Sequence, residues 1–444
     1  MSIYQFTDSN DSNKKYKYKV LVYPNITYQK DLEKDSYVVV LCNIIKELNK
    51  IRDDIHWTIF SPQHITSLDF ENTKQLILPL PTYPNAMRLH FDQKKIIKAL
   101  DFRKNDYDIV YSHLPEHTLQ LKNVFLNETN IEPKFIGYTH WTEFPEITNY
   151  AATVMDINFL GLLAMDKCGI NTQGQKNLIL KNAKTHFNDT VVNRLDEILE
   201  PQYLGWEIPK YKKQTTDKKI IVFNHRPHAY KNYPWFLQQM DKLWKKRQDF
   251  EVWVPLADKI EKEYMTNDKY DRVGYFSKLS SCYLGVCAKQ KYSGWAISAT
   301  DGMSVGVPYM FSDDDYYHEL AGDGGVYYKN DGLVDLIDEF LDDTDMRNTW
   351  SQKAFNRFEQ GKWESAIKPF NKMMDETIYN LPTLKSDTDT YKKVVDFIHK
   401  KGSVSKADIL NFLNWGVRIS FSGYRNRLRN EPTIRFTKNR YEVK

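Results

Sequence analysis

The sequence predicts an α/β protein with two parallel-sheet domains and a smaller basic module at its C-terminal end. Short apolar segments rich in β-branched and aromatic residues alternate with segments of helical periodicity along most of the chain. A polar stretch at 210–219 divides this series into two halves, and basic residues accumulate near the end. A chain of 444 residues has room for two or three domains. We expect them at 1–212, 213–383 and 384–444.

The first half begins with a strand at Tyr18–Tyr23, a loop, and a helix within Lys34–Lys50. The same alternation continues with strands at His56–Phe60, Gln75–Leu80, Tyr107–Tyr111 and Lys134–Tyr138. Ligands of such sheets bind beyond the carboxyl ends of the strands, where His113 and His140 stand. A loop histidine is more often a packing or hydrogen-bonding residue than a catalyst, so both roles stay open.

The second half repeats the pattern after the polar stretch. Its expected strands are Ile220–Phe223, Val252–Val254, Arg272–Tyr275, Cys282–Val286 and Val307–Phe311. Two α/β halves joined by a linker would enclose a cleft. An amphipathic helix, Trp363–Tyr379, follows the second half, and its spacing by itself indicates only a packed face.

The segment 220–232, with the sequence IIVFNHRPHAYKN, is the first candidate for chemistry. A buried strand ends at Asn224, and Arg226 and Lys231 follow in a tight loop. Two cations at the end of a parallel strand suit a diphosphate. The alternative is an ordinary solvated loop.

A second segment, 293–313, carries a sequence signature. Its parts are Gly294-Trp295, Asp301-Gly302-Met303 and Gly306-Val307-Pro308, and the run 322–326 (GDGGV) continues it. This pattern resembles the signature of retaining nucleotide-sugar glycosyltransferases of family four, which have the two-domain GT-B fold. The resemblance covers roughly residues 17–380, although only 220–232 and 293–326 are specific.

The resemblance implies a role for each matching residue. Arg226 and Lys231 would neutralise the departing nucleoside diphosphate, Asp301 would hold the ribose hydroxyls, and His140 would face the transferred sugar. The other implied donor-binding residues are Ser293, Gly294, Gly302 and, around the base, Gly274, Phe276 and Leu279. The family has a glutamate where this chain has Ser293, so the sugar and the anomeric outcome stay open. A UDP-sugar is the expected donor, without a tightly bound cofactor, and a metal requirement stays open.

The C-terminal module, 384–444, holds 14 Lys and Arg against six Asp and Glu, a net charge of +8. Apolar spacing predicts a helix around Tyr391–Ile398 and a second helix that begins with a capping box at Ser405 and Asp408. A third helix would span Ser420–Arg429, and a hairpin would turn at Lys438-Asn439. Three helices and a basic two-stranded wing resemble a winged helix-turn-helix.

This module is expected to bind double-stranded DNA. The candidate DNA-binding residues are Arg418, Arg425, Arg427, Arg429, Arg435, Lys438 and Arg440. Arginines four residues apart on a helix repel one another unless phosphates face them. The alternative is a structural cap or a protein-contact module.

Together, these features predict an enzyme that moves a sugar from a nucleotide sugar to a hydroxyl on a modified pyrimidine base in DNA. Phage enzymes with this activity share the GT-B fold. The alternatives are a GT-B transferase of cell-surface polysaccharide synthesis and a non-catalytic DNA-binding regulator that senses a nucleotide sugar.

The composition excludes an integral membrane protein. Apolar residues make up 41% of the chain, and no apolar stretch approaches the roughly 20 residues that a bilayer requires. The polar N-terminus has no secretory pattern, so we expect a cytoplasmic protein, in a bacterial host if the gene is viral. The four cysteines are scattered and are expected to be reduced core residues. The oligomeric state stays open.

Overall fold

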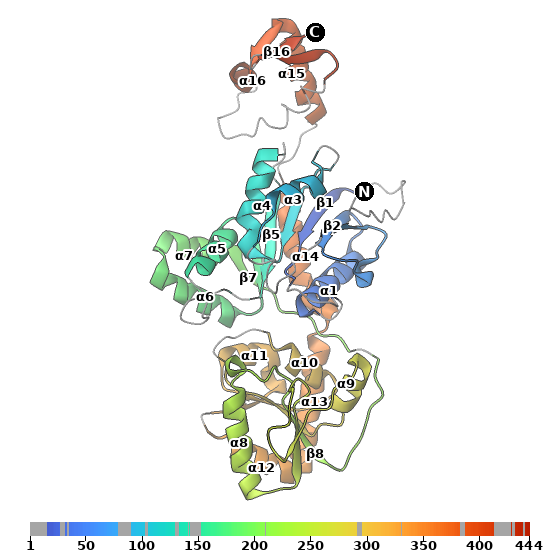
Figure 1. The fold of residues 1–444 in the computed structure, drawn as a ribbon, viewed down its shortest axis with the longest axis vertical. Helices are drawn as coiled ribbons and strands as arrows, with labels where there is room; N and C mark the ends of the chain where they lie inside the picture. Colours follow the sequence, from blue (N-terminus) through green and yellow to red (C-terminus); the bar gives the residue numbers. More distant parts are fainter. Residues whose placement is uncertain are drawn as a thin grey trace. The chain divides into compact units, whose positions relative to one another are not determined.

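The computed structural model groups the helices and strands around three sheets (Figure 1). The structure describes residues 16–26, 32, 35–78, 90–102, 105–128, 133–140, 142, 152–208, 210–290, 295–329, 331–381, 387–412, 428, 431–437 and 440–444.

The first sheet has seven strands in the order β3-β2-β1-β4-β5-β6-β7. The strands are β1 Tyr18–Tyr23, β2 Ile55–Ser61, β3 Thr73–Ile77, β4 Ile109–Ser112, β5 Lys134–Thr139, β6 Lys167–Ile170 and β7 Leu199–Pro201. The helices are α1 Ser36–Ile51, α3 Gln93–Leu100, α4 Pro115–Glu128, α5 Ala152–Leu163, α6 Gln173–His186 and α7 Asp189–Ile198. Central β1 pairs in parallel with β2 and β4, with Val20 opposite Trp57 and Ile109. The five predicted strands are confirmed, although β3 ends three residues earlier than expected.

The second sheet has six strands in the order β10-β9-β8-β11-β12-β13. Its strands are β8 Lys219–Val222, β9 Phe250–Trp253, β10 Met265–Thr266, β11 Leu284–Cys287, β12 Tyr309–Ser312 and β13 Val326–Tyr328, all paired in parallel. Its helices are α8 Tyr233–Lys246, α9 Arg272–Leu279, α10 Ile297–Ser304, α11 Asp315–Ala321, α12 Leu333–Asp342 and α13 Thr344–Gln360.

One predicted strand, Arg272–Tyr275, is wrong, because these residues form the start of helix α9. Asp271 caps this helix, and its carboxylate accepts a hydrogen bond of 2.7 Å from the backbone N–H of Gly274. Phe276 and Leu279, three residues apart, are both fully buried. The apolar pattern therefore follows the helical period rather than the strand period.

Both faces of the second sheet are packed. Ile221 and Phe236 of α8 belong to one apolar cluster, and Ile220 and Met303 of α10 belong to the other. Neighbouring strand residues face opposite sides of a sheet, so the two clusters cover its two faces. All four cysteines are free and buried, which confirms the prediction that they are core residues.

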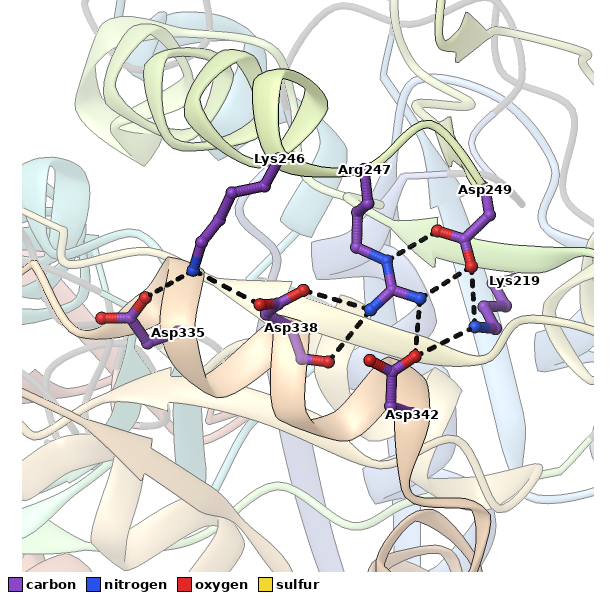
Figure 2. Close-up of polar contacts among 7 residues, drawn as sticks. All are labelled: Lys219, Lys246, Arg247, Asp249, Asp335, Asp338 and Asp342. Carbon is purple, nitrogen blue, oxygen red and sulfur yellow. Dashed lines mark hydrogen bonds and ion pairs between the residues drawn. The ribbon is translucent and has the colours of Figure 1, made fainter.

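An ion-pair network joins α8, α12 and the amino ends of β8 and β9 (Figure 2). Arg247 is its centre: its guanidinium binds both carboxylate oxygens of Asp249, at 2.6 and 2.7 Å. It also reaches Asp338 at 3.1 Å and Asp342 at 2.7 Å. The Arg247 side chain is only 14% exposed, so this fork-like pairing is held more firmly than a surface pair. Lys219, Lys246 and Asp335 complete the network.

Helix α14, Trp363–Tyr379, coincides with the amphipathic helix that the sequence predicts. Backbone contacts divide the chain into two compact units, and the division falls inside this helix, after Phe370. Beyond that point, Asn371 and Asp375 accept hydrogen bonds of 3.1 and 2.9 Å from Arg52, which follows α1. The last turns of α14 are thus anchored to the first half of the chain.

The C-terminal module contains α15 Asp387–Lys401, β14 Ser403–Ser405, α16 Lys406–Phe412, β15 Ile434–Thr437 and β16 Arg440–Val443. The three strands pair antiparallel in the order β14-β16-β15, around a core that includes Val394, Ile409 and Tyr441. The hairpin is confirmed, and so is the capping box, in which Ser405 and Asp408 bond each other's backbone N–H. The predicted third helix lies outside the described residues except for Leu428, which is fully buried.

Candidate active site

Polar side chains gather beyond the carboxyl ends of β8 and β11. The strand order reverses between these two strands, because β9 and β10 lie on one side and β12 and β13 on the other. Ligands of open α/β sheets bind at such a reversal. The loop after β8, Asn224 to Lys231, is therefore the first part of the candidate site.

Arg226 and Lys231 present two cations from this loop. The Arg226 side chain is exposed, and its guanidinium has no ion-pair partner among the residues that the structure describes. The Lys231 ammonium donates a hydrogen bond of 2.7 Å to the side-chain oxygen of Gln290, just after β11. Burial, together with the nearby Arg226 charge, lowers the pKa of Lys231 to about 8. A diphosphate bound here would stabilise the charged form of Lys231.

Asn224 connects the end of β8 to three neighbouring elements. Its amide nitrogen donates to the Tyr275 hydroxyl of α9 at 2.8 Å and to the Ser298 carbonyl of α10 at 2.7 Å. Its amide oxygen accepts a hydrogen bond of 2.9 Å from the hydroxyl of Tyr309 in β12. The buried amide is thus fully used and fixes the position of the loop.

His225 makes a second connection, which the sequence did not indicate. One ring nitrogen lies 2.8 Å from the hydroxyl of Ser298, and the other lies 3.0 Å from the sulfur of Cys287. Burial lowers the pKa of His225 to about 3, so the ring is neutral and works as a hydrogen-bonding link. The cationic loop and helix α10 are therefore held in a fixed relation.

Asp301 lies on α10, with its carboxylate 3.4 Å from the Tyr275 hydroxyl. Burial raises the pKa of Asp301 to about 7, although Arg272 and Tyr275 act in the opposite direction. A poorly solvated carboxylate gains from hydroxyl donors, and the ribose of a nucleotide supplies two of them. The geometry thus brings Asp301 into the same polar network as Asn224.

The other predicted donor-binding residues have different surroundings. Phe276 and Leu279 are fully buried in the apolar cluster, so their side chains cannot contact a base, and the N–H of Gly274 already bonds Asp271. A Cβ on Gly302 would collide with the Tyr309 ring, so this glycine permits close packing. Ser293 and Gly294 lie outside the described residues.

The two candidate histidines of the first half are both buried. The His140 backbone carbonyl accepts hydrogen bonds of 3.0 Å from Asn171 and 2.7 Å from Gln175, and burial lowers the pKa of its ring to about 3. The His113 ring packs against Tyr111, with ring centroids 4.8 Å apart. His113 is therefore a packing residue, whereas the catalytic role of His140 stays a prediction.

Two of the predicted DNA-binding residues fall within the described part of the module. Arg435 lies 3.3 Å from Glu442 and is 60% exposed. Arg440 donates to the hydroxyl and carbonyl oxygens of Ser403, at 2.8 and 3.0 Å, and lies 3.8 Å from Asp408. Arg418, Arg425, Arg427, Arg429 and Lys438 lie outside the described residues.

Comparison with known proteins gives a family match in the second half of the chain. Residues 206–357 match the model of the glycosyl transferases group 1 domain, a range that contains the whole second sheet and its cationic loop. No curated protein sequence matches the chain.

Several solved structures share the fold. Sucrose-phosphate synthase from Thermosynechococcus elongatus is 11% identical, with a TM-score of 0.61 over 81% of this chain and 99% of that chain. Anabaena HepE in complex with UDP-glucose is also 11% identical, with a TM-score of 0.58 over 81% of this chain and 100% of that chain. An α,α-trehalose-phosphate synthase (UDP-forming) from Burkholderia vietnamiensis is 9% identical, with a TM-score of 0.58 over 82% and 97%.

The fold is GT-B, and the matching domain makes the chain a nucleotide-sugar-dependent glycosyltransferase. Among the described helices, none has the length and apolar character that a membrane span needs.

Proposed function

We propose that this enzyme transfers a sugar from a UDP-sugar to a hydroxyl on a modified pyrimidine base in double-stranded DNA. Residues 1–212 and 213–383 would form the two GT-B domains, and 384–444 would form the DNA-binding module. The uridine nucleotide is supported by the relatives, since HepE was solved with UDP-glucose and the trehalose-phosphate synthase is UDP-forming.

The donor half of the proposal is supported by the loop after β8. When the bond between the anomeric carbon and the diphosphate oxygen breaks, the electron pair stays with the diphosphate, and negative charge grows there. Fixed cations at that point lower the barrier, and Arg226 and Lys231 provide two. The acceptor oxygen forms the new bond to the anomeric carbon, and its proton is released to water. Asp301 would hold the ribose, and His140 would face the sugar.

The acceptor half of the proposal is carried by one observation, the C-terminal module. A helix, a strand, a second helix and a terminal hairpin, with strand order β14-β16-β15, suit a winged helix. Its net charge of +8 suits a polyanion. Lys392, Lys393 and Lys400 of α15 are exposed and add to the charge that Arg435 and Arg440 present.

The test combines the purified chain with duplex DNA that contains hydroxymethylcytosine and with a panel of UDP-sugars. Mass spectrometry of the digested nucleosides should show a hexose or pentose added to the modified base and none on unmodified DNA. A chain ending at Thr383 should still hydrolyse UDP-sugar slowly but should lose DNA affinity and its steep salt dependence. Equal DNA binding by the full and shortened chains would refute the DNA acceptor, and transfer to sugar phosphates or glycans instead would identify another acceptor class.

A further inference from the structure

A cavity of about 570 Å³ opens at the carboxyl edge of the second sheet. It lies next to the cationic loop, Asn224 to Lys231, but is lined by other residues. Its walls come from the first turn of α8, the segment after β11, and the loops that follow β12 and β13. Arg226, Lys231 and Asp301 are not among the residues that line it. The size lies in the usual range of small-molecule sites.

One wall of the cavity is aromatic. Trp235 of α8 stacks on Tyr328 of β13, with ring centroids 5.9 Å apart and planes only 12° from parallel. Tyr328 is buried, and its hydroxyl donates to the Cys287 carbonyl at 3.3 Å, so the pair is rigid. An indole that lines a cavity and is held by a buried tyrosine can serve as a platform for an apolar ring face.

The rest of the described lining is polar, with an excess of one negative charge. Three carboxylates, those of Asp313, Asp314 and Asp331, face two lysines. Lys289 lies 3.3 Å from Asp314, and Lys329 lies 3.4 Å from Asp313. The negative excess among the described lining residues disfavours phosphates and nucleotides. A metal ion is also disfavoured, because the described residues contain no group of three His, Cys, Asp or Glu side chains arranged to hold one.

A neutral ligand with an apolar ring face and many hydroxyl groups fits both the aromatic wall and the polar lining. Its hydroxyls would donate to Asp331, which has no bonded partner among the described residues, and would accept from Lys329. Asn232 offers a further amide, because its side chain does not cap α8. We infer that this cavity is a sugar-binding subsite, separate from the nucleotide-sugar site, in which a pyranose ring stacks on Trp235.

The sugar could be free or could belong to a glycosylated polymer, and both sources share this chemistry. Calorimetric titration of the full chain, saturated with UDP, with glucose, galactose and maltotriose tests the free form. We expect saturable binding of at least one sugar at millimolar concentration. A second titration compares glucosylated with unglucosylated hydroxymethylcytosine duplex, and a preference for the glucosylated duplex identifies the polymer as the source.

Trp235→Ala should weaken sugar binding at least tenfold, and Trp235→Phe should retain most of it. Trp244→Ala is the matched control, since Trp244 is also a partly buried tryptophan of α8 that packs on the same apolar cluster but does not line the cavity. Absence of saturable sugar binding to the UDP-saturated chain, or an equal loss of binding in the Trp244 variant, would overturn the inference. Because the free-sugar assay contains no DNA, its result is independent of the proposed acceptor.

Discussion

Lys231→Met should make the protein more stable and far less active, because the same buried charge is costly for folding and useful for chemistry. Burial lowers the pKa of Lys231 from 10.5 to about 8, and at 1.36 kcal/mol per pKa unit this corresponds to roughly 3 kcal/mol. Part of the gain is lost because Gln290 loses the hydrogen bond from the ammonium. We therefore expect the free energy of unfolding at pH 7 to rise by about 1–2 kcal/mol.

The activity should change in the opposite direction. Removing one of the two cations that we propose to face the developing charge of the diphosphate should lower turnover by about 10²-fold or more. UDP release from the donor measures this change, and urea denaturation measures the stability. Lys245→Met is the control, since Lys245 is exposed on α8, and it should alter neither quantity.

The pH dependence gives a further check on Lys231. The folded pKa is about 8 and the ordinary value is 10.5, so the unfolded chain binds more protons between these values, and wild-type stability rises with pH across that range. The advantage of the methionine variant should therefore be complete below about pH 8 and should vanish near pH 10.5. A variant that keeps wild-type turnover, or that is less stable at pH 7, would refute the assignment.

Three further predictions concern residues in the helices and loops around the second sheet. Asp301→Asn should raise the donor KM more than it lowers kcat, and the acid limb of the donor kcat/KM profile near pH 7 should disappear; a loss confined to kcat would contradict a ribose contact. His225→Leu should raise the donor KM about tenfold, since α10 loses its bond to the cationic loop, whereas His186→Gln, at the exposed end of α6, should not; equal effects would exclude a positioning role. Arg247→Ala should lower the free energy of unfolding by about 2 kcal/mol in urea titrations, against less than about 1 for the half-exposed Lys246→Ala, and should leave donor KM unchanged.

The sequence predicted the elements whose apolar pattern is long enough to be distinctive. Helix α14 matches its predicted bounds, and the Ser405–Asp408 capping box forms as expected, because both depend on local spacing. Strands β10 and β13 have two and three residues, too few for any period to be visible. The four residues of Arg272–Tyr275 by themselves fit a strand and a helix equally well, and the Asp271 cap before them and the helical spacing of Phe276 and Leu279 after them decide for the helix.

The candidate site likewise contains residues that a local pattern predicts and residues that depend on contacts distant in the sequence. Arg226 and Lys231 could be found because a buried strand followed by two cations is a local pattern. The link from His225 to Ser298 joins residues 73 positions apart, so no local pattern reveals it. Gly302 stood in the signature as a donor residue, yet it packs on Tyr309, whose hydroxyl bonds Asn224. Such a glycine supports the site through packing, which spacing cannot distinguish from contact with a ligand.

The Arg247 network lies at the amino end of β8, whereas the cationic loop, Asn224 to Lys231, follows its carboxyl end. This separation matters for directed evolution of the enzyme. Substitutions around Arg247 should appear in screens for heat tolerance or soluble yield, whereas substitutions after β8 should appear in screens for a new sugar donor. The hydrogen-bond partners of the two groups differ among the described residues, so the effects of the two sets of mutations should add. Stabilising substitutions could therefore be introduced first at the amino ends of the strands. The added stability would then allow more substitutions in the loops at the carboxyl ends.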